Sequence, residues 1–165
     1  MVKTLLDMSE LQTIGRDETI AVDALVDEVM VDLEPLAQEK EIKLIRNCKD
    51  TTMVGSDILI YRMVYNLVEN AIKYNHFGGQ VTITAYRNGK NICLSVEDTG
   101  SGIPAELKER IFEPFFRVDK SRSRQLGGVG LGLALVREIV RVHDGRITVQ
   151  SSPSGGTIFE VVFTQ

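Results

Sequence analysis

The chain has 165 residues, of which 43% are hydrophobic and 25% charged; these values fit one globular domain with a core of useful size. The formal net charge is −4, which argues against a general nucleic-acid-binding protein, because such proteins need a positively charged surface. Cys48 and Cys93 lack CxxC spacing, so neither a zinc site nor a disulfide framework is expected, and a reducing compartment fits. No apolar run approaches the roughly 18 residues of a membrane span and no signal peptide is visible, so we expect a soluble domain.

The first half of the chain alternates short strands with amphipathic helices. Residues 5–12 have a helical pattern that Gly15 stops; the pattern is too short for a stable helix alone and indicates the end of a longer one. The patterns then predict a strand over 19–22, a helix capped by Asp23 that runs to about Lys40 with Pro35 as a possible kink, a hairpin of strands 43–48 and 51–54 around Lys49-Asp50, and a long helix from Ser56 to about Tyr74.

The second half predicts more strands, with helices between them. In order, these are a hairpin of strands 81–86 and 92–96 around Asn88-Gly89, a short helix over 104–112, a charged stretch of no clear period over 113–130, a helix over 131–142, and a strand pair over 146–151 and 157–163. The fold class is therefore α/β: a two-layer sandwich in which a mixed, mostly antiparallel sheet carries helices on one face.

The long helix carries a polar stripe. At about 100° per residue, Asn66, Asn70 and Lys73 fall on one narrow face beside the apolar one. Asn is disfavoured in helix interiors because its side chain competes for the hydrogen bonds of the backbone. A functional explanation is that amide oxygens face a hard cation such as Mg²⁺ while the Lys meets a phosphate. A solvated helix face is the plain structural alternative, and spacing alone leaves both open.

Two glycine-containing segments are further candidates. Asp98-Thr-Gly100-Ser-Gly102-Ile103 follows a predicted strand; its glycines allow backbone to approach a ligand and its Asp can accept a hydrogen bond from an amine, although a plain turn has the same composition. Residues 127–132 hold four glycines in six positions before a helix, which suits an anion site or a hinge. They match neither a Walker A loop nor a dinucleotide fingerprint.

The remaining candidates are weaker. Residues 112–117 hold three of the six Phe and end in Arg117. They indicate a small satellite core, an anchor for a mobile lid whose basic residues meet phosphates, or both; those basic residues are Arg117, Lys120, Arg122 and Arg124. Gly155-Gly156-Thr157 before the last strand reads as a hairpin turn. His76 lies in a turn, and His143 ends a helix, where an imidazolium suits the dipole. Neither has the neighbouring Glu that a phospho-accepting His would show.

Taken in order, these segments resemble the catalytic and ATP-binding domain of bacterial sensor histidine kinases, in the superfamily of gyrase, the heat-shock protein of ninety kilodaltons and MutL. They correspond to the family's N, G1, F, G2 and G3 boxes. The resemblance covers residues from about 19 to 163, and it implies an α/β sandwich that binds ATP or ADP with Mg²⁺.

The resemblance also implies roles for individual residues. Asn70 matches the Mg²⁺ ligand, Asn66 and Lys73 match residues around the phosphates, and Asp98 matches the reader of the adenine amino group. The other matched positions are Tyr74, Gly100, Gly102, Ile103 and Thr157 around the nucleotide base, and Gly128, Val129, Gly130, Leu131, Gly132 and Arg117 in the ATP lid.

One family element is missing from the sequence. Nothing matches the H box, the phospho-accepting His on a two-helix dimerisation hairpin. The resemblance thus implies that residues 1–15 are the remnant of that hairpin's second helix with a linker, and that residues 16–165 are a monomeric, cytoplasmic catalytic domain. The whole protein is then expected to be an integral membrane receptor that is paired with a response regulator.

The implied reaction is transfer of the ATP γ-phosphoryl group to a histidine on a separate dimerisation domain, with Asn66, Lys73 and Arg117 as the catalytic candidates. Hydrolytic relatives and serine kinases of this fold tend to carry a Glu where Asn66 stands. An amide cannot take a proton from water, so Asn66 favours the histidine kinase. A domain that binds ATP without turnover is the non-enzymatic alternative.

Overall fold

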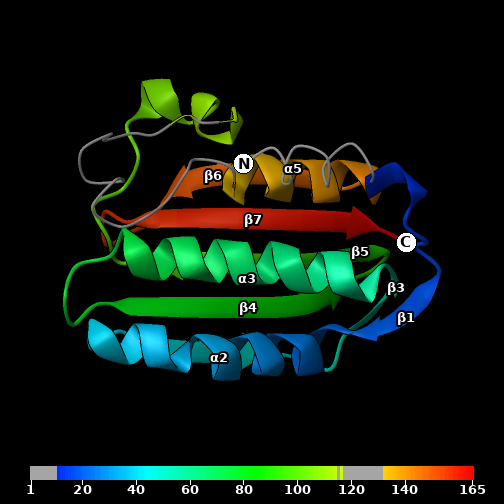
Figure 1. Ribbon diagram of the computed structural model, residues 1–165, viewed down its shortest axis with the longest axis horizontal. Helices are drawn as coiled ribbons and strands as arrows, with labels where there is room; N and C mark the ends of the chain where they lie inside the picture. Colours follow the sequence, from blue (N-terminus) through cyan, green and yellow to red (C-terminus); the bar gives the residue numbers. More distant parts are fainter. Residues whose placement is uncertain (1–10, 115, 117–131) are drawn as a thin grey trace.

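A five-stranded sheet covered on one face by α-helices organises the protein (Figure 1). The structure is a computed structural model, which describes residues 11–114, 116 and 132–165. Its elements are η1 (Leu11–Thr13), β1 (Glu18–Ala21), α2 (Val22–Glu39), β2 (Lys43–Cys48), β3 (Thr52–Gly55), α3 (Asp57–Lys73), β4 (Gln80–Asn88), β5 (Asn91–Asp98), η2 (Ala105–Leu107), η3 (Arg110–Phe112), α5 (Gly132–Val142), β6 (Arg146–Ser151) and β7 (Thr157–Thr164).

The sheet is mixed, as the sequence predicts. Its strand order is β2-β4-β5-β7-β6, in which β2 pairs parallel with β4 and every other pair is antiparallel. β1 and β3 form a separate antiparallel ribbon. Residues on β7 and on most of β4 alternate between buried and more exposed positions, as expected for a sheet with one covered face; β5 alternates only from Leu94 onward, because Ile92, Cys93 and Leu94 are all buried. The predicted α/β sandwich is confirmed.

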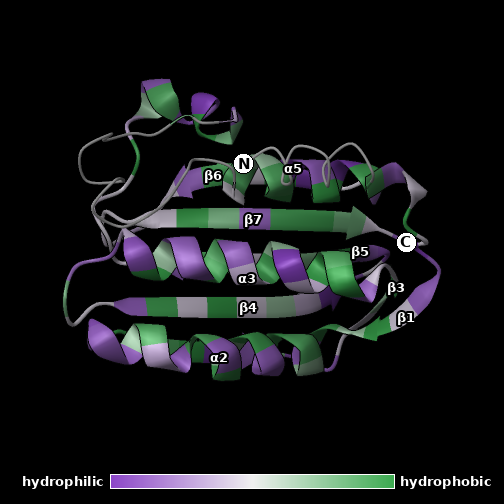
Figure 2. Ribbon diagram, viewed as in Figure 1, coloured by the Kyte–Doolittle hydropathy of each residue, from purple (hydrophilic) through white to green (hydrophobic). Residues whose placement is uncertain are grey.

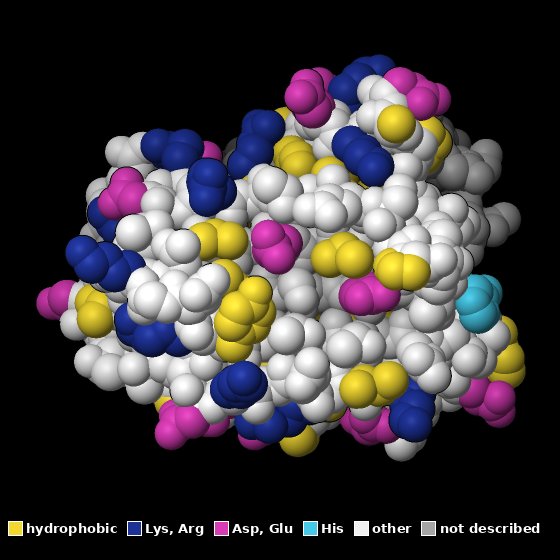
Figure 3. Space-filling view, turned by 180° about the vertical axis from the view of Figure 1, so that it is seen from behind, with side chains coloured by type: hydrophobic (Ala, Val, Ile, Leu, Met, Phe, Trp, Pro, Cys, Tyr) yellow, Lys and Arg dark blue, Asp and Glu magenta, His cyan; other side chains and the backbone are white. Residues whose placement is uncertain are grey.

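Helix α3 lies at the centre of the helical layer, with α2 on one side and α5 on the other (Figure 1). Its buried residues recur at helical spacing and face the sheet: Leu59, Ile60, Met63, Val64, Leu67, Val68, Ala71 and Ile72. The outward faces of α2 and α3 carry many hydrophilic residues (Figure 2). The other face of the sheet is open and shows a mixture of apolar and charged side chains (Figure 3). A single core therefore lies between the two layers.

The hairpin predicted around Lys49-Asp50 is wrong. β2 pairs with β4, and β3 pairs with β1 in the other sheet. The Lys49 N–H continues the first pairing, because it donates to the Ala85 carbonyl (2.9 Å). Lys49-Asp50 also lacks the glycine or asparagine that favours positive φ in a two-residue hairpin turn, so nothing local holds these strands together.

Asp23 is not the cap of α2. The N-cap position falls on Ala21, which makes no side-chain cap bond, because β1 runs directly into the helix. The Asp23 carboxylate instead accepts from the Thr51 N–H (3.5 Å) and pairs with Arg46 (3.8 Å). Asp23 therefore joins the start of α2 to both neighbouring strands.

Other element boundaries agree more closely with the sequence. Ser56 caps α3, since its hydroxyl accepts from the Leu59 N–H (3.4 Å). The β4–β5 loop is one residue later than predicted, at Gly89-Lys90, with Gly89 at a φ of 63°. The predicted helix over 104–112 is instead two short 3-10 helices, η2 and η3. Among the described residues, no helix combines the length and the apolar character that crossing a membrane requires.

Candidate nucleotide-binding site

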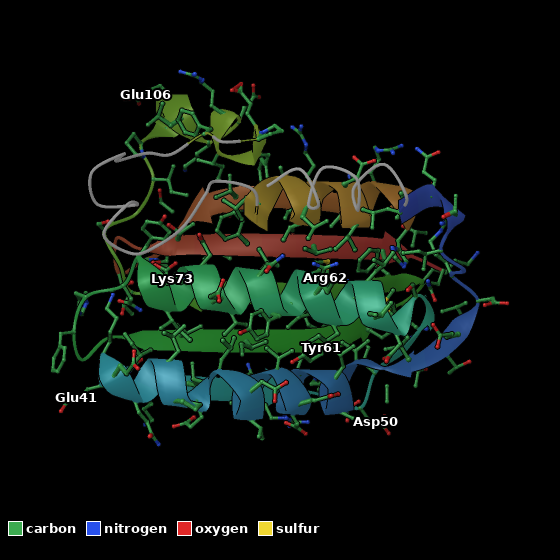
Figure 4. All side chains as sticks on the ribbon, viewed as in Figure 1. Glu41, Asp50, Tyr61, Arg62, Lys73 and Glu106 are labelled. Carbon is green, nitrogen blue, oxygen red and sulfur yellow. The ribbon has the colours of Figure 1, made fainter. Side chains whose placement is uncertain are left out.

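The candidate site residues gather at one end of the sheet. There β5 ends at Asp98, β7 begins at Thr157, and α3 ends at Lys73. This is the left end of the molecule in Figure 1, and Lys73 is labelled there in Figure 4. Because β5 and β7 pair antiparallel, two segments far apart in sequence meet beside the last turn of the central helix.

Asp98 is the buried acid of this site, with 7% of its surface exposed. Its Oδ1 accepts hydrogen bonds from the Gly100 N–H (2.8 Å) and the Thr157 N–H (3.2 Å). Oδ2 has no partner among the described residues. Burial raises the pKa of the Asp98 carboxyl above its ordinary value, and the two backbone N–H groups oppose that rise. Asp98 thus holds a fixed carboxylate with one acceptor oxygen that no described residue engages.

Glycines line the chain around Asp98 because no side chain fits there. A Cβ on Gly100 would lie 2.6 Å from the Tyr74 carbonyl oxygen, and one on Gly156 would lie 2.0 Å from the Asp98 carbonyl oxygen. Gly102 has a φ of 77°, and its Cβ would lie 2.6 Å from the Gly155 carbonyl oxygen. The structure therefore brings together the two glycine segments that the sequence shows separately.

Ser152 is a site-supporting residue that sequence reasoning missed. Its buried hydroxyl accepts from the Gly156 N–H (2.9 Å) and donates to the Asp98 carbonyl (3.4 Å). It lies in a Ser-Ser-Pro-Ser-Gly-Gly run that reads as an ordinary turn, so no local signal marks it. Ser152 fixes the start of β7 against the end of β5.

The polar stripe of α3 is present, and all three of its residues, Asn66, Asn70 and Lys73, are partly exposed. The Lys73 Nζ lies 3.7 Å from the Glu69 carboxylate, one turn earlier. Glu69 is the acid nearest to Asn66 along the helix, and its partner in the structure is Lys73. Among the described residues, no group of three or more His, Cys, Asp or Glu could hold a metal ion.

Asn75 is a second residue that the sequence did not single out. Its side chain is fully buried and donates to the Gln80 carbonyl (2.9 Å). Its Oδ1 accepts from the His76 N–H (2.9 Å) and from the Thr99 hydroxyl (3.1 Å). The turn after α3 is thereby joined to the start of β4 and the end of β5. A polar residue after a helix is common, so its burial shows only in the fold.

The lid candidates can be placed only in part. Arg117, Gly128, Val129, Gly130 and Leu131 lie outside the described residues, and Gly132 is the first residue of α5. In the Phe-rich segment, Phe112 is buried and packs edge-on against Phe159, with ring centres 6.2 Å apart. Phe116 lies under the Arg110 guanidinium (4.7 Å). Phe112 therefore belongs to the main core, and the interpretation of this segment as a separate satellite core is wrong for Phe112. Ile103 packs, partly buried, against the core.

The two histidines lie away from this arrangement of acid and glycines. His76 is exposed in the turn after α3. His143 is half-buried: its Nε2 accepts from the Ser56 N–H (3.0 Å) and its Nδ1 contacts the Ile139 carbonyl (2.8 Å). Burial lowers the pKa of His143 below its ordinary value. The interpretation of His143 as an imidazolium that favours the helix dipole is therefore wrong, because the ring must be neutral at Nε2 to accept the hydrogen bond from the Ser56 N–H.

Comparison with known proteins identifies the family. Residues 55–165 match the family described as histidine kinase-, DNA gyrase B- and HSP90-like ATPase. The sensor-like histidine kinase SenX3 of Mycobacterium tuberculosis is 40% identical over 163 residues, which is 96% of this chain and 40% of SenX3. The chain thus spans well under half the length of this relative.

Solved structures agree with the sequence match. The catalytic domain of histidine kinase ThkA, in a nucleotide-free form, aligns with a TM-score of 0.79 at 28% identity over 91% of this chain and 97% of that one. ThkA in complex with response regulator protein TrrA aligns at 0.76, with 27% identity, over 90% and 41%. Full-length ShkA in complex with AMPPNP aligns at 0.84, with 26% identity, over 98% and 34%. The chain therefore belongs to the histidine kinase-, DNA gyrase B- and HSP90-like ATPase family, as an ATP-binding catalytic domain of the histidine kinase type.

Proposed function

We propose that this domain binds ATP with Mg²⁺ at the end of the sheet where Asp98 lies, and transfers the γ-phosphoryl group to a histidine on a dimerisation domain. The observation that carries the proposal is the Asp98 carboxylate: it is buried, held by two backbone N–H groups through one oxygen, and open at the other. Burying a carboxylate is costly unless its acceptors find donors. An exocyclic amine of adenine would supply the donor that Oδ2 lacks among the described residues.

The glycine segments shape the surface that the base would meet. Gly100 and Gly102 keep backbone close to Asp98 without adding side-chain volume, and Thr157 follows Gly156 on the other strand. We assign Tyr74, Ile103 and Thr157 to the walls of the base site because they flank these glycines. A planar base suits such a surface because it needs close backbone approach on its faces and one acceptor at its edge.

The polar stripe of α3 is our candidate for the phosphate end. Mg²⁺ prefers oxygen ligands and keeps phosphates and water in its coordination shell, so the Asn70 amide oxygen fits this ion. Bound Mg²⁺ would offset phosphate charge. Lys73 would add a cationic contact near the phosphates and Asn66 an amide contact. Lys73 would then exchange its partly exposed ion pair with Glu69 for phosphate. Arg117 and the glycines at 128, 130 and 132 would complete the lid.

The residue at position 66 favours kinase over hydrolase. The Asn66 amide can orient a water but cannot deprotonate it. The Glu69 carboxylate, the nearest acid along the helix, is paired with Lys73. Attack by an imidazole from another domain needs no base in this one, because phosphoryl transfer depends mostly on positioning and on charge neutralisation.

The whole protein would be a two-component sensor kinase. The match to a sensor-like histidine kinase and the ThkA complex with a response regulator support this assignment. We propose that residues 1–15 join the catalytic domain to the dimerisation hairpin, that the histidine accepting phosphate lies on that hairpin, and that the complete chain is an integral membrane receptor with this domain in the cytoplasm.

Asp98→Asn tests the base site. The amide can still accept from Gly100 and Thr157 through its oxygen, but its NH₂ would then face the adenine amine, donor against donor. We expect ADP affinity to fall about 10- to 150-fold, equivalent to roughly 1.5–3 kcal/mol for a charged hydrogen bond. Titration calorimetry measures it.

Asp144→Asn is the matched control. Asp144 is exposed and has a φ of 57°, a conformation that asparagine tolerates, so the same chemical change should leave ADP affinity unaltered. Unchanged ADP binding by a folded Asp98→Asn variant would remove Asp98 from the nucleotide site.

Label transfer tests the reaction itself. With ATP labelled at the γ-phosphate and a separately supplied dimerisation domain, acid-labile label should appear on the histidine of that domain, and only when this chain and Mg²⁺ are both present. ADP binding without any transfer would instead support the domain that binds nucleotide without turnover.

A further inference from the structure

Lys40, just after α2, reaches across to the last turn of α3. Its Nζ donates to the carbonyl oxygens of Ile72 (3.2 Å), Lys73 (2.8 Å) and Asn75 (2.7 Å). Lys40 is partly buried, and α2 and α3 end at the same edge of the molecule, where Lys73 and Glu41 are labelled in Figure 4. One ammonium group therefore binds three carbonyls where α3 stops.

The contact has a clear electrostatic reason. The last carbonyls of a helix lack intrahelical donors, and together they form the negative end of the helix dipole. In α3 that end lies at the candidate nucleotide site, where a triphosphate would also bring negative charge. A lysine ammonium has three donors in a compact group, so it can satisfy several carbonyls at once and offset the local field.

The backbone reinforces the same connection. The Gly78 N–H donates to the Lys40 carbonyl (2.9 Å), so the turn after α3 is tied to Lys40 from both sides. Tyr74 lies between the carbonyls that Lys40 binds, and its own carbonyl is the atom that a Cβ on Gly100 would meet at 2.6 Å. A shift of this turn would therefore change the surface beside Asp98.

We propose that Lys40 is a positioning residue for nucleotide binding, which holds the end of α3 so that the Tyr74 backbone stays against Gly100 and the glycine surface beside Asp98 keeps its shape. This inference rests on the proposed function, but the positioning itself can be measured without nucleotide. Lys40 contacts no nucleotide in this proposal and acts only through the last turn of α3.

The test compares three variants. Lys40→Met keeps the length of the side chain and removes its charge and donors. Lys40→Arg keeps the charge but spreads the donors over a planar group. Lys43→Met is the matched control, because Lys43 is exposed and its side chain has no described partner. Each is measured by circular dichroism melting, by amide resonances of Gly100 and Thr157 without nucleotide, and by ADP calorimetry well below the melting midpoint.

We expect Lys40→Met to shift the Gly100 amide resonance and to weaken ADP about fivefold, the scale of a cation at a helix C-terminus. Lys40→Arg should fall between it and wild type, and Lys43→Met should match wild type. A folded Lys40→Met protein with unmoved Gly100 resonance and wild-type ADP affinity overturns the inference.

Two further outcomes are decisive. If Lys40→Met does not fold, Lys40→Arg decides: a Gly100 resonance and an ADP affinity indistinguishable from wild type contradict the dependence on a compact ammonium that we expect, and the inference fails. If wild type itself binds no adenine nucleotide, the proposed function fails, while the Gly100 resonance in Lys40→Met still decides whether Lys40 positions this turn.

Discussion

At the scale of single residues, the site depends on backbone atoms that are packed too closely to accommodate an added side chain. Asp98 uses its side chain to hold the backbone of Gly100 and Thr157, and its own carbonyl lies where a side chain on Gly156 would be. Ser152 closes the same arrangement through the Gly156 N–H. Backbone contacts of this kind cannot yield as a flexible side chain can, so the glycines are required by packing as well as by any ligand.

Gly156→Ala should therefore damage both fold and site. Its methyl group would meet the Asp98 carbonyl at 2.0 Å, so the two strand ends must separate. We expect the free energy of unfolding in urea to fall by about 1–3 kcal/mol, as for other overpacked sites, and ADP affinity to fall with it. Gly15→Ala is the control: Gly15 is exposed, and a Cβ there would meet only Asp17 at an ordinary 3.7 Å. Equal stability of the two variants would contradict this account.

At the scale of elements, α3 is held at both ends by residues distant in sequence. Lys40 binds its last carbonyls. At its start, the Ser56 N–H donates to the Nε2 of His143, which lies just after α5 and contacts the Ile139 carbonyl through Nδ1. The ring also packs edge-on against Phe163, with centres 5.9 Å apart. The helix that carries the polar stripe is thus fixed relative to its neighbours.

His143 should make stability depend on pH. Because burial lowers its pKa in the folded state, the unfolded chain binds a proton more readily, and protonation would place an N–H against the Ser56 N–H. The stabilisation is therefore fully present above the unfolded pKa of about 6.5 and is lost as pH falls through the lower folded value. We expect the free energy of unfolding to decrease between about pH 7 and pH 5.

Paired histidine variants isolate that contribution. His143→Gln should remove part of the pH dependence measured by urea unfolding, whereas His76→Gln, a change in an exposed turn, should retain all of it. A His143→Gln protein with the wild-type pH profile would show that the Ser56 contact carries no such linkage.

At the scale of the whole molecule, neither of the two histidines in this sequence is placed as a phospho-acceptor. His143 engages both ring nitrogens in contacts with the protein, and His76 is exposed in a turn with no neighbouring Glu of the kind a phospho-accepting His would show. We expect no acid-labile phosphate on this chain after incubation with labelled ATP and Mg²⁺. Phosphopeptide mapping by mass spectrometry under alkaline conditions checks this. Label on either histidine would contradict the proposal that the accepting histidine lies on a separate dimerisation domain.

Local periodicity was enough to predict most elements and the sandwich. Alternation over 81–86 and 92–96 specifies one covered sheet face, and the apolar spacing of 57–73 specifies a helix that lies on it. The order of the polar and glycine segments also indicated a nucleotide site, because their chemistry is set by residue type. These properties depend on neighbours within a few positions, which is the information that a single sequence carries directly.

Only the tertiary structure decided how the segments meet. β2 pairs parallel with β4 instead of forming the predicted hairpin. Three hydrogen bonds also join residues far apart in the chain: Asp98–Thr157, Lys40–Lys73 and Ser56–His143. Each of these contacts uses a backbone N–H or carbonyl, which every residue type offers except for the N–H of proline. Such partners cannot be identified from residue type. The contacts that support the site could therefore be found only in the tertiary structure, where packing of the core brings the ends of the elements together.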